Sequence, residues 1–271
     1  MATLSHIAVH PIKALDPVDR ERVTATAAGG LAHDRSYAFV DNTGSYVNGK
    51  RTADVHRLRA DVDLERGCVA LRREGETTGH EFHLDDDRDA LETWASEYFG
   101  AAVSLEVGSG GTQTDGAVYG NTERTGPTLV SEATLREVAS WYDVTPAEMR
   151  LRLRPNLVVD GVPAFWEDKL VAGDGRRVRI GDVVLVGTHA IPRCIVPARD
   201  PHTGEKEENF RQTFVEKREA SLPAWTDEKT LDGNLYSVTV GTRIPESERE
   251  SELRVGDEVT LLPEDAVSSQ E

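Results

Sequence analysis

Cys194 is the residue whose type and neighbours point most directly to chemistry. It follows Arg193 and precedes the turn sequence Asp200-Pro201-His202-Thr203-Gly204. Positive charge beside a thiol favours the thiolate, which can serve as a metal ligand or as a nucleophile. A lone cysteine is more often a structural residue in a core. Both interpretations stay open on these residues alone.

Three further sets of residues could bind an anion. Arg154 and Asn156 enter an apolar run, where the guanidinium can grip phosphate and the amide can contact a heterocycle. Lys13 and Arg35 each lie near the end of a predicted strand. Ser131 opens a predicted helix, whose first N–H groups attract phosphate. Surface ion pairs, ordinary loops and a plain helix cap are the alternatives.

Short apolar and β-branched runs separated by Gly, Asp and Asn turns predict a mainly β protein with some helices (α+β). Residues 108–126 lack any apolar period and are predicted to be a linker or a long functional loop. This divides the chain into an N-terminal β-barrel-like domain at 1–110 and a second β-barrel domain at 125–265. The predicted strands are 4–9, 22–27, 37–40, 58–64, 68–71, 128–130, 156–159, 178–180, 183–186, 194–196, 235–240 and 258–262. Helices are predicted near 87–98, 131–142 and 209–220, and another helical turn is predicted to start at 145–146.

Composition narrows the class of protein. The net charge of −17 argues against nucleic acid and anionic membranes as partners. No apolar run is long enough to cross a bilayer, and the first residues alternate like a strand rather than a signal peptide, so a cytoplasmic location is expected. Two cysteines without zinc spacing argue against a structural zinc site, an iron–sulfur cluster or a disulfide.

The order of the short motifs resembles the MOSC family with its N-terminal β-barrel domain, and within it the group of the mitochondrial amidoxime reducing component. The resemblance runs from about residue 3 to residue 263. The motifs that carry it are Pro11-Ile12-Lys13, Gly30-Leu31, Asp34-Arg35, Lys50-Arg51, Arg154-Pro155-Asn156-Leu157-Val158-Val159, Glu167-Asp168, Ile180-Gly181-Asp182, Arg193-Cys194, Asp200-Pro201, Thr203-Gly204 and Val255-Gly256-Asp257.

This resemblance implies a molybdenum–molybdopterin cofactor in a cleft between the two domains. It implies Cys194 as the metal ligand and catalytic residue, a choice that agrees with the softness of a thiolate. Asp168, or Glu167 beside it, is the candidate proton donor. The expected cofactor contacts are Lys13, Arg35, Arg51, Ser131, Arg154, Asn156 and Arg193. Pyridoxal phosphate binding is a label of the family only.

Two functions follow from the resemblance, and they belong to different classes. The first is an oxidoreductase that reduces N-hydroxylated or N-oxide compounds. Because the chain lacks a cysteine quartet, its electrons are expected from a separate donor such as a ferredoxin or a flavoprotein. The second is sulfur transfer or cofactor handling, with Cys194 as a persulfide site, and a pure carrier without turnover is a variant of it. Stoichiometric molybdenum in the purified protein would favour the first.

The charge of −17 predicts a halophile-like response to salt. Repulsion among the carboxylates weakens as ions screen it, so the thermal unfolding midpoint should rise from low to molar KCl. Thermal unfolding followed across this series measures the effect. A flat or falling midpoint would remove the halophile-like interpretation and leave the acidity unexplained.

Overall fold

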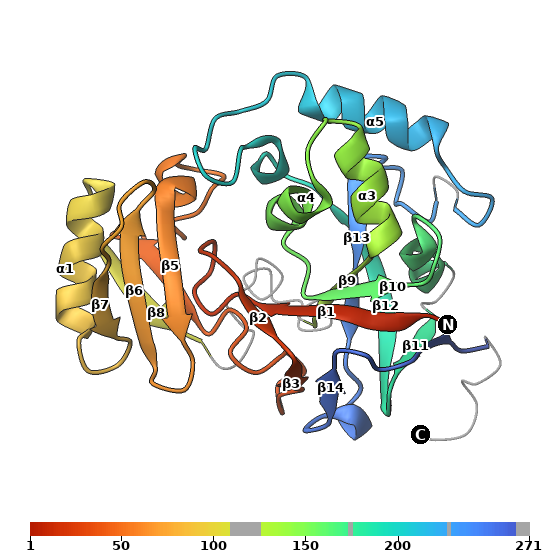
Figure 1. The fold of residues 1–271 in the computed structure, drawn as a ribbon, viewed down its shortest axis with the longest axis horizontal. Helices are drawn as coiled ribbons and strands as arrows, with labels where there is room; N and C mark the ends of the chain where they lie inside the picture. Colours follow the sequence, from red (N-terminus) through yellow and green to blue (C-terminus); the bar gives the residue numbers. More distant parts are fainter. Residues whose placement is uncertain (109–125, 173–175, 227–228, 264–271) are drawn as a thin grey trace.

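The computed structural model describes residues 1–108, 126–172, 176–226 and 229–263. Figure 1 shows a smaller part, which holds β4 to β8 and α1, and a larger part, in which a long sheet lies beside α3, α4 and α5. The mainly β fold with some helices is confirmed. The segment predicted to be a linker or a loop, apart from residues 108 and 126, lies outside the described residues.

A sheet of eight strands forms the centre of the larger part. Its neighbouring strands are antiparallel except β9 and β10, which are parallel. A parallel pair needs a crossover connection, and two helices provide it, α3 (Glu132–Ser140) and α4 (Pro146–Leu153). The strand order is β15 (Val259–Leu261), β11 (Arg177–Ile180), β12 (Val183–Pro192), β13 (Ser237–Arg243), β9 (Thr128–Ser131), β10 (Leu157–Asp160), β1 (Thr3–Val9) and β2 (Val18–Arg20).

The two crossover helices begin where the sequence predicts. The Ser131 hydroxyl accepts a hydrogen bond from the N–H of Thr134, and the Thr145 hydroxyl accepts one from the N–H of Glu148. Such caps satisfy donors that the first turn of a helix leaves unpaired. α4 ends at Arg154, whose φ of 55° lies in the left-handed region.

The structure changes two strand predictions near Cys194. The strand predicted at 183–186 extends to Pro192. The strand predicted at 194–196 is wrong, because the chain there forms the 3-10 helix η4 (Val196–Ala198). Pro192 and Pro197 have no N–H to donate to a ladder, so the strand cannot continue through this segment. Cys194 therefore lies in a loop at the end of β12.

Within the described residues, the smaller part consists of a two-stranded sheet, a three-stranded sheet, one α-helix and one 3-10 helix. Its core contains Leu58, Val69, Leu71 and Leu91, which alternate with exposed residues along the strands or lie on one face of the helix. Cys68 is buried in β6 as an ordinary strand residue. The elements are β4 (Tyr37–Asp41), η1 (Asp54–Arg57), β5 (Leu58–Asp63), β6 (Cys68–Arg73), β7 (His80–His83), α1 (Arg88–Phe99) and β8 (Val103–Val107).

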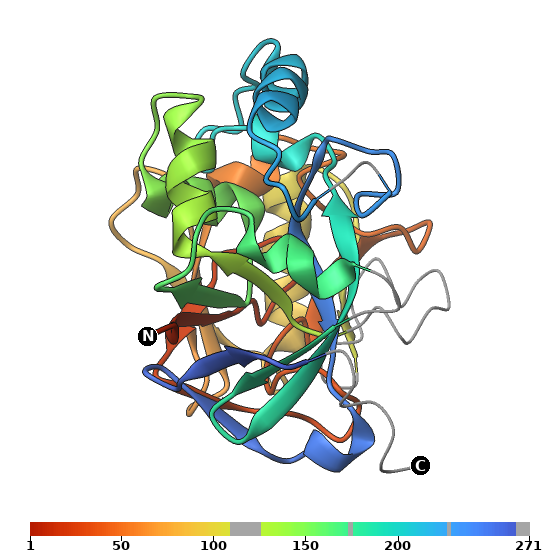
Figure 2. The ribbon, with the colours of Figure 1, turned by 90° about the vertical axis from the view of Figure 1, so that its right-hand side faces the viewer.

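The beginning of the chain belongs to the sheet of the larger part. β1 pairs with β10, and β3 (Arg22–Thr24) pairs with β14 (Glu252–Arg254). Figures 1 and 2 show β3 and β14 at the end of the molecule opposite α5. Strands from the beginning of the chain thus pair with strands from its second half. The domain limits 1–110 and 125–265 stay predictions.

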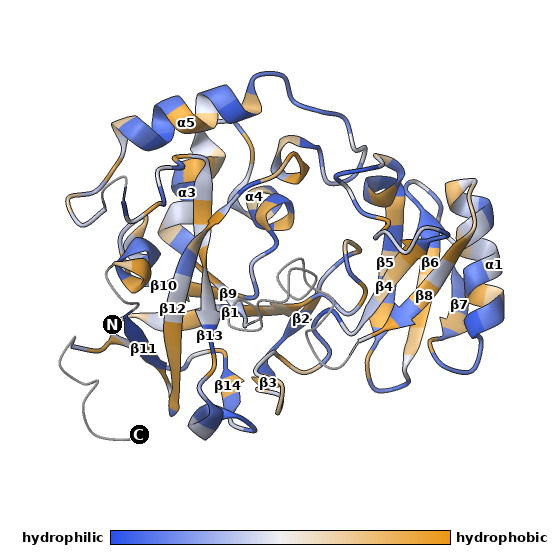
Figure 3. Ribbon diagram, turned by 180° about the vertical axis from the view of Figure 1, so that it is seen from behind, coloured by the Kyte–Doolittle hydropathy of each residue, from blue (hydrophilic) through white to orange (hydrophobic). Residues whose placement is uncertain are grey.

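The helices are amphipathic. Figure 3 shows hydrophilic and hydrophobic residues alternating along α1 and α5 (Phe210–Ala220). α5 buries Phe210, Phe214 and Arg218 against the rest of the larger part. None of the helices in the described ranges is long and apolar enough to cross a membrane. The remaining 3-10 helices are η3 (Trp166–Val171) and η5 (Glu246–Glu248).

A buried charged cluster lies between η3 and α5. Arg218 is fully buried and forms an ion pair with Asp168, which also accepts a hydrogen bond of 2.9 Å from Thr226. Glu167, with 1% of its surface exposed, lies beside this pair. Burial raises the pKa of Glu167 to about 7, and the Asp168 carboxylate contributes to the rise. Glu167 is therefore protonated in the folded chain under mildly acidic conditions.

The buried Glu167 predicts a loss of stability as pH rises. The unfolded chain releases this proton near the ordinary pKa of 4.5 and the folded chain only near 7, so stability falls between these values. Glu167→Gln should flatten this slope and raise the unfolding free energy near neutral pH by up to about 3 kcal/mol. Urea unfolding at mildly acidic and mildly alkaline pH measures both effects. Glu97→Gln, at an exposed position, is the control, and equal slopes in parent and Glu167→Gln would contradict the prediction.

Candidate functional site

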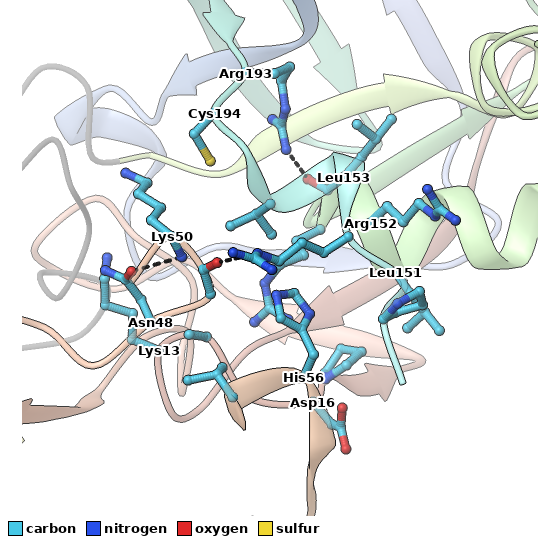
Figure 4. Close-up of a pocket in the computed structure, with 18 of the residues that line it drawn as sticks. Lys13, Asp16, Asn48, Lys50, His56, Leu151, Arg152, Leu153, Arg193 and Cys194 are labelled. Atoms are coloured by element: carbon cyan, nitrogen blue, oxygen red, sulfur yellow. Dashed lines mark hydrogen bonds between the residues drawn. The ribbon is translucent and has the colours of Figure 1, made fainter. Parts of the chain in front are cut away.

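A cavity of about 270 Å³ lies between residues of the smaller part and residues of the larger part. Figure 4 shows side chains from both parts converging on it. Five predicted site residues line it: Lys13, Arg35, Arg154, Arg193 and Cys194. Other residues that line it are Asp16, Asn48, Lys50, His56, Arg59, Thr128, Arg152 and Arg199.

Cys194 is partly exposed at this cavity, and Figure 4 shows its sulfur directed into the space between the side chains. The loop that carries it is fixed on both sides. The N–H of Arg193 donates to the Tyr236 carbonyl at 2.9 Å, and the Tyr236 hydroxyl donates to the Cys194 carbonyl at 3.1 Å. Burial raises the pKa of Tyr236 to about 12, so its hydroxyl keeps the proton that it donates. The position predicted for Cys194 agrees with the structure, whereas its role as a ligand stays a prediction.

Backbone carbonyls hold three guanidinium groups at the cavity. Arg154 donates to the carbonyl of Leu15 at 2.6 Å, and Arg193 donates to that of Leu153 at 2.8 Å. Arg199 donates to the carbonyls of residues 49 and 204, at 3.1 and 2.9 Å. Among the described carboxylates, none lies within ion-pair distance of these three arginines. A carbonyl satisfies a hydrogen bond but does not cancel the charge, so the positive field remains.

Arg35 is held from behind by a buried network. Its Nη1 forms an ion pair with Asp34 and donates to the Asn156 side-chain oxygen at 3.3 Å. Asp34 also accepts a hydrogen bond of 2.8 Å from the N–H of His10. Burial alone would raise the pKa of Asp34, but Arg35 and His10 hold it well below its ordinary value. The carboxylate is therefore a fixed anchor for Arg35, whose own φ of 48° is left-handed.

The side chains around the cavity are mostly cationic. Burial, together with Arg199 and Arg154, lowers the pKa of His56 to about 4, so this imidazole is neutral. Burial beside Arg35 lowers the pKa of Arg154 to about 10, which still leaves it charged near neutral pH. The lining includes eight Lys and Arg residues and one carboxylate, Asp16. In a chain of charge −17, this cavity is suited to an anionic ligand.

Two predicted cofactor contacts lie away from the cavity lining. Arg51 is half-exposed and donates to the Asp41 carboxylate at 2.8 Å. Ser131 is fully buried, and its hydroxyl is engaged with Thr134 as the cap of α3. These hydrogen bonds use the Ser131 hydroxyl within the protein, and a phosphate contact at the start of this helix stays a prediction.

Two further predicted site residues lie outside the cavity lining, and their roles stay predictions. Asn156 is fully buried behind Arg35, where its side-chain oxygen also accepts from the N–H of Thr128 at 3.1 Å. It orients the residues of the cavity wall and does not itself line the cavity. Asp168, the predicted proton donor, and its neighbour Glu167 lie in the buried cluster with Arg218, because that arginine needs a charge partner in the core.

Arg59, Arg199 and His56 are cavity residues that the sequence did not single out. Arg59 lies on β5 between buried residues, a position that predicts only the exposed face of a strand. Arg199 directly precedes the Asp200-Pro201 motif, which was the available signal. Their convergence depends on how the smaller part packs against the larger part, and the local sequence does not encode this.

Matches to protein families cover most of the chain. Residues 1–101 match the MOSC N-terminal beta barrel domain, and residues 127–260 match the MOSC domain. The chain belongs to the MOSC family. This family is associated with the molybdenum cofactor.

Relatives within the family are distant. The chain is 21% identical to the molybdenum cofactor sulfurase of Oryza sativa subsp. japonica over 232 residues. This alignment covers 70% of this chain and 27% of the rice protein. The chain thus spans about a quarter of the length of the rice protein (27%). It is 25% identical to mitochondrial amidoxime reducing component 2 of Bos taurus over 244 residues, 75% of this chain and 68% of that protein. A solved structure, the YUAD protein from Bacillus subtilis, aligns with a TM-score of 0.40 at 12% identity, covering 95% of this chain and 93% of that chain.

The network behind Arg35 predicts a large stability effect for Asp34→Asn. The substitution leaves the Arg35 charge without its partner, which should lower the unfolding free energy by about 3 kcal/mol. Urea unfolding near neutral pH measures the change. Glu81→Gln removes a carboxylate from the exposed pair with Arg66 and should have a much smaller effect. Equal effects of the two substitutions would contradict the anchoring role of Asp34.

Proposed function

We propose that the chain binds a molybdenum–molybdopterin cofactor in the cation-lined cavity and reduces N-hydroxylated or N-oxide compounds. The observation that carries this proposal is the position of Cys194 at a cavity where three guanidinium groups, those of Arg154, Arg193 and Arg199, are held by main-chain carbonyls. Membership of the MOSC family and the similarity to an amidoxime reducing component support it.

The residues present fit such a cofactor. A thiolate is a soft ligand suited to a metal with sulfur ligands, and Cys194 is partly exposed to the cavity. Arg154, Arg193 and Arg199 supply donors and charge for a phosphate tail, and Arg35 lies on the same wall. Lys13 lines the cavity as well, with its ammonium 4.6 Å from the centre of the Tyr46 ring.

The proposed reaction is a two-electron reduction. The N–O bond of the substrate breaks, the oxygen leaves as water, and two protons and two electrons are consumed. When bound, the cofactor would supply the oxygen-atom chemistry. The cationic side chains that line the cavity would bind and orient the substrate, and Asp168 lies outside this lining. We propose a separate ferredoxin or flavoprotein as the electron donor, since the chain has two cysteines.

A second candidate function is sulfur transfer, with Cys194 as a persulfide carrier that matures or handles the cofactor. The exposure of Cys194 and the similarity to a molybdenum cofactor sulfurase favour this candidate. The two functions differ in metal content. A reductase should be purified with about one molybdenum per chain from a host that makes the cofactor, whereas a sulfur carrier should contain far less.

Cys194→Ser tests the reductase directly. It replaces a soft ligand by a hydroxyl that remains mostly protonated, so bound molybdenum and turnover of an amidoxime should fall at least about tenfold. Molybdenum is measured by elemental mass spectrometry and turnover with a chemical reductant. The folding of this variant should change little, because the side chain is partly exposed.

Cys68→Ser is the matched control. Cys68 is buried in β6, so its substitution should lower the unfolding free energy by about 1 kcal/mol and leave the metal content unchanged. Full molybdenum and full turnover in Cys194→Ser would overturn both the ligand and the proposed reaction. Persulfide on Cys194 without stoichiometric molybdenum in the parent protein would favour the sulfur carrier.

A further inference from the structure

β13 is irregular where it pairs with the end of β12. The partner of Ala190 is Val240, and the partner of Pro192 is Ser237. β13 therefore uses three steps where β12 uses two, and the extra residue makes residues 238–239 a β-bulge. This bulge lies opposite the last residues of β12, directly before the loop that carries the predicted metal ligand.

The bulge is required by the packing of two cores on opposite faces of the sheet. On β10, the adjacent residues Leu157 and Val158 belong to different cores, as alternation along a strand requires. On β13, Val238 packs in the core beside α3, α4 and α5, whereas Val240 packs in the core of the other face. Residues two apart on a regular strand share a face, so the extra residue is what turns the strand over. Its position is thus fixed by buried side chains on both sides.

Thr239 has a strained backbone at this bulge. Its φ is 68°, in the left-handed region, which β-branched side chains disfavour. It is the only β-branched residue with a positive φ in the described part of the chain. Glycine would adopt this conformation without a steric cost. Strain of this kind persists where the surrounding structure holds it, and it is concentrated at functional sites.

The Thr239 side chain contacts the loop that carries Cys194. Arg193 Nη1 donates to the Thr239 hydroxyl at 3.4 Å, and Arg193 Nη2 donates to the Leu153 carbonyl at 2.8 Å. Arg193 Nε is buried without a hydrogen-bond partner among the described residues. Two neutral oxygens therefore hold this guanidinium. Arg193 and Cys194 line the same cavity, and Figure 4 shows both side chains directed into it.

We propose that Thr239 is a positioning residue, whose hydroxyl is placed by the β13 bulge to fix the Arg193 guanidinium beside Cys194. Glycine would remove the strain but supply no hydroxyl, so the strained threonine supplies a contact that the unstrained residue lacks. A hydroxyl leaves the positive charge available to an anion, which a carboxylate would not. The role of Arg193 toward the cofactor rests on the proposed function, whereas its position beside Cys194 does not.

Alkylation of Cys194 reports where this guanidinium lies. In a Cys68→Ser background Cys194 is the only thiol of the chain. Iodoacetate carries a negative charge and iodoacetamide none, and both react with the thiolate. The ratio of their rates at one pH is independent of the thiolate fraction and rises with positive charge near the sulfur. The measurement uses the full chain from a host that does not make the cofactor.

Thr239→Val keeps the shape of the side chain and removes the hydroxyl. It should lower the ratio of the iodoacetate rate to the iodoacetamide rate about threefold, part of the roughly tenfold fall expected for Arg193→Met, which removes the charge. Thr239→Ser keeps the hydroxyl and should stay within about twofold of the parent. Thr239→Gly suits the positive φ and lacks the hydroxyl, so it should show the same fall as Thr239→Val even if the valine variant folds poorly.

Thr242→Val is the matched control. Thr242 lies on the same strand, is fully buried and donates its hydroxyl to the Pro127 carbonyl at 2.7 Å. The substitution makes the same chemical change away from Arg193, so the rate ratio should equal that of the parent. An unchanged ratio in Arg193→Met or in the two Thr239 variants without a hydroxyl, or a fall matched by Thr242→Val, would overturn the inference.

Molybdenum content separates this inference from the proposed function. In protein from a host that makes the cofactor, Thr239→Val should contain less molybdenum than the parent, and Thr239→Ser should match the parent. A fall of the rate ratio confined to Thr239→Val and Thr239→Gly, in a chain whose parent is purified without molybdenum, would support the positioning role and overturn only the proposed reductase.

Discussion

The cation-lined cavity depends on one physical constraint. Several guanidinium groups must be held close together without a carboxylate that would neutralise their positive charge. Arg154, Arg193 and Arg199 meet it by donating to main-chain carbonyls. A hydrogen bond to a charged group contributes about 1.5–3 kcal/mol, enough to fix a long side chain. A carboxylate would hold these groups as firmly but would neutralise the field on which an anionic ligand depends.

The same hydrogen bonds join segments that are distant in sequence. Arg154 at the end of α4 reaches Leu15, and Arg199 after η4 reaches residue 49 of the smaller part. In the opposite direction, Arg57 of the smaller part donates a hydrogen bond of 2.8 Å to the Thr203 carbonyl of the larger part. The cavity is thus also the place where the two parts are tied together. The same hydrogen bonds therefore determine both the shape of the cavity and the packing of the two parts.

Charge is distributed unevenly through the molecule. The chain carries −17 overall, yet cations predominate around the cation-lined cavity. Carboxylates near this cavity, such as Asp34 and Glu207, are bound to arginines. The acidic chain therefore leaves this cavity attractive to anions. Cys194 lies at its edge.

Local sequence was sufficient for much of the fold. Alternation of apolar residues predicted the main strands, and the caps at Ser131 and Thr145 predicted the starts of α3 and α4. These signals work because they depend on neighbours within a few residues. The same reasoning failed at 194–196 and passed over β7 and β8, which are short or whose ladders depend on partners elsewhere in the chain.

The sequence also determined the types of residue at the site, since Lys13, Arg35, Arg154, Arg193 and Cys194 were all named from their motifs. Tertiary structure alone decided which side chains face the cavity. Ser131 and Asn156 are turned inward because their hydrogen-bond partners, Thr134, Thr128 and Arg35, lie on that side. Asp168 is drawn into the core by a fully buried arginine fifty residues later in the chain, Arg218. A motif fixes the chemistry of a side chain, but its direction follows from long-range packing, which no local pattern contains.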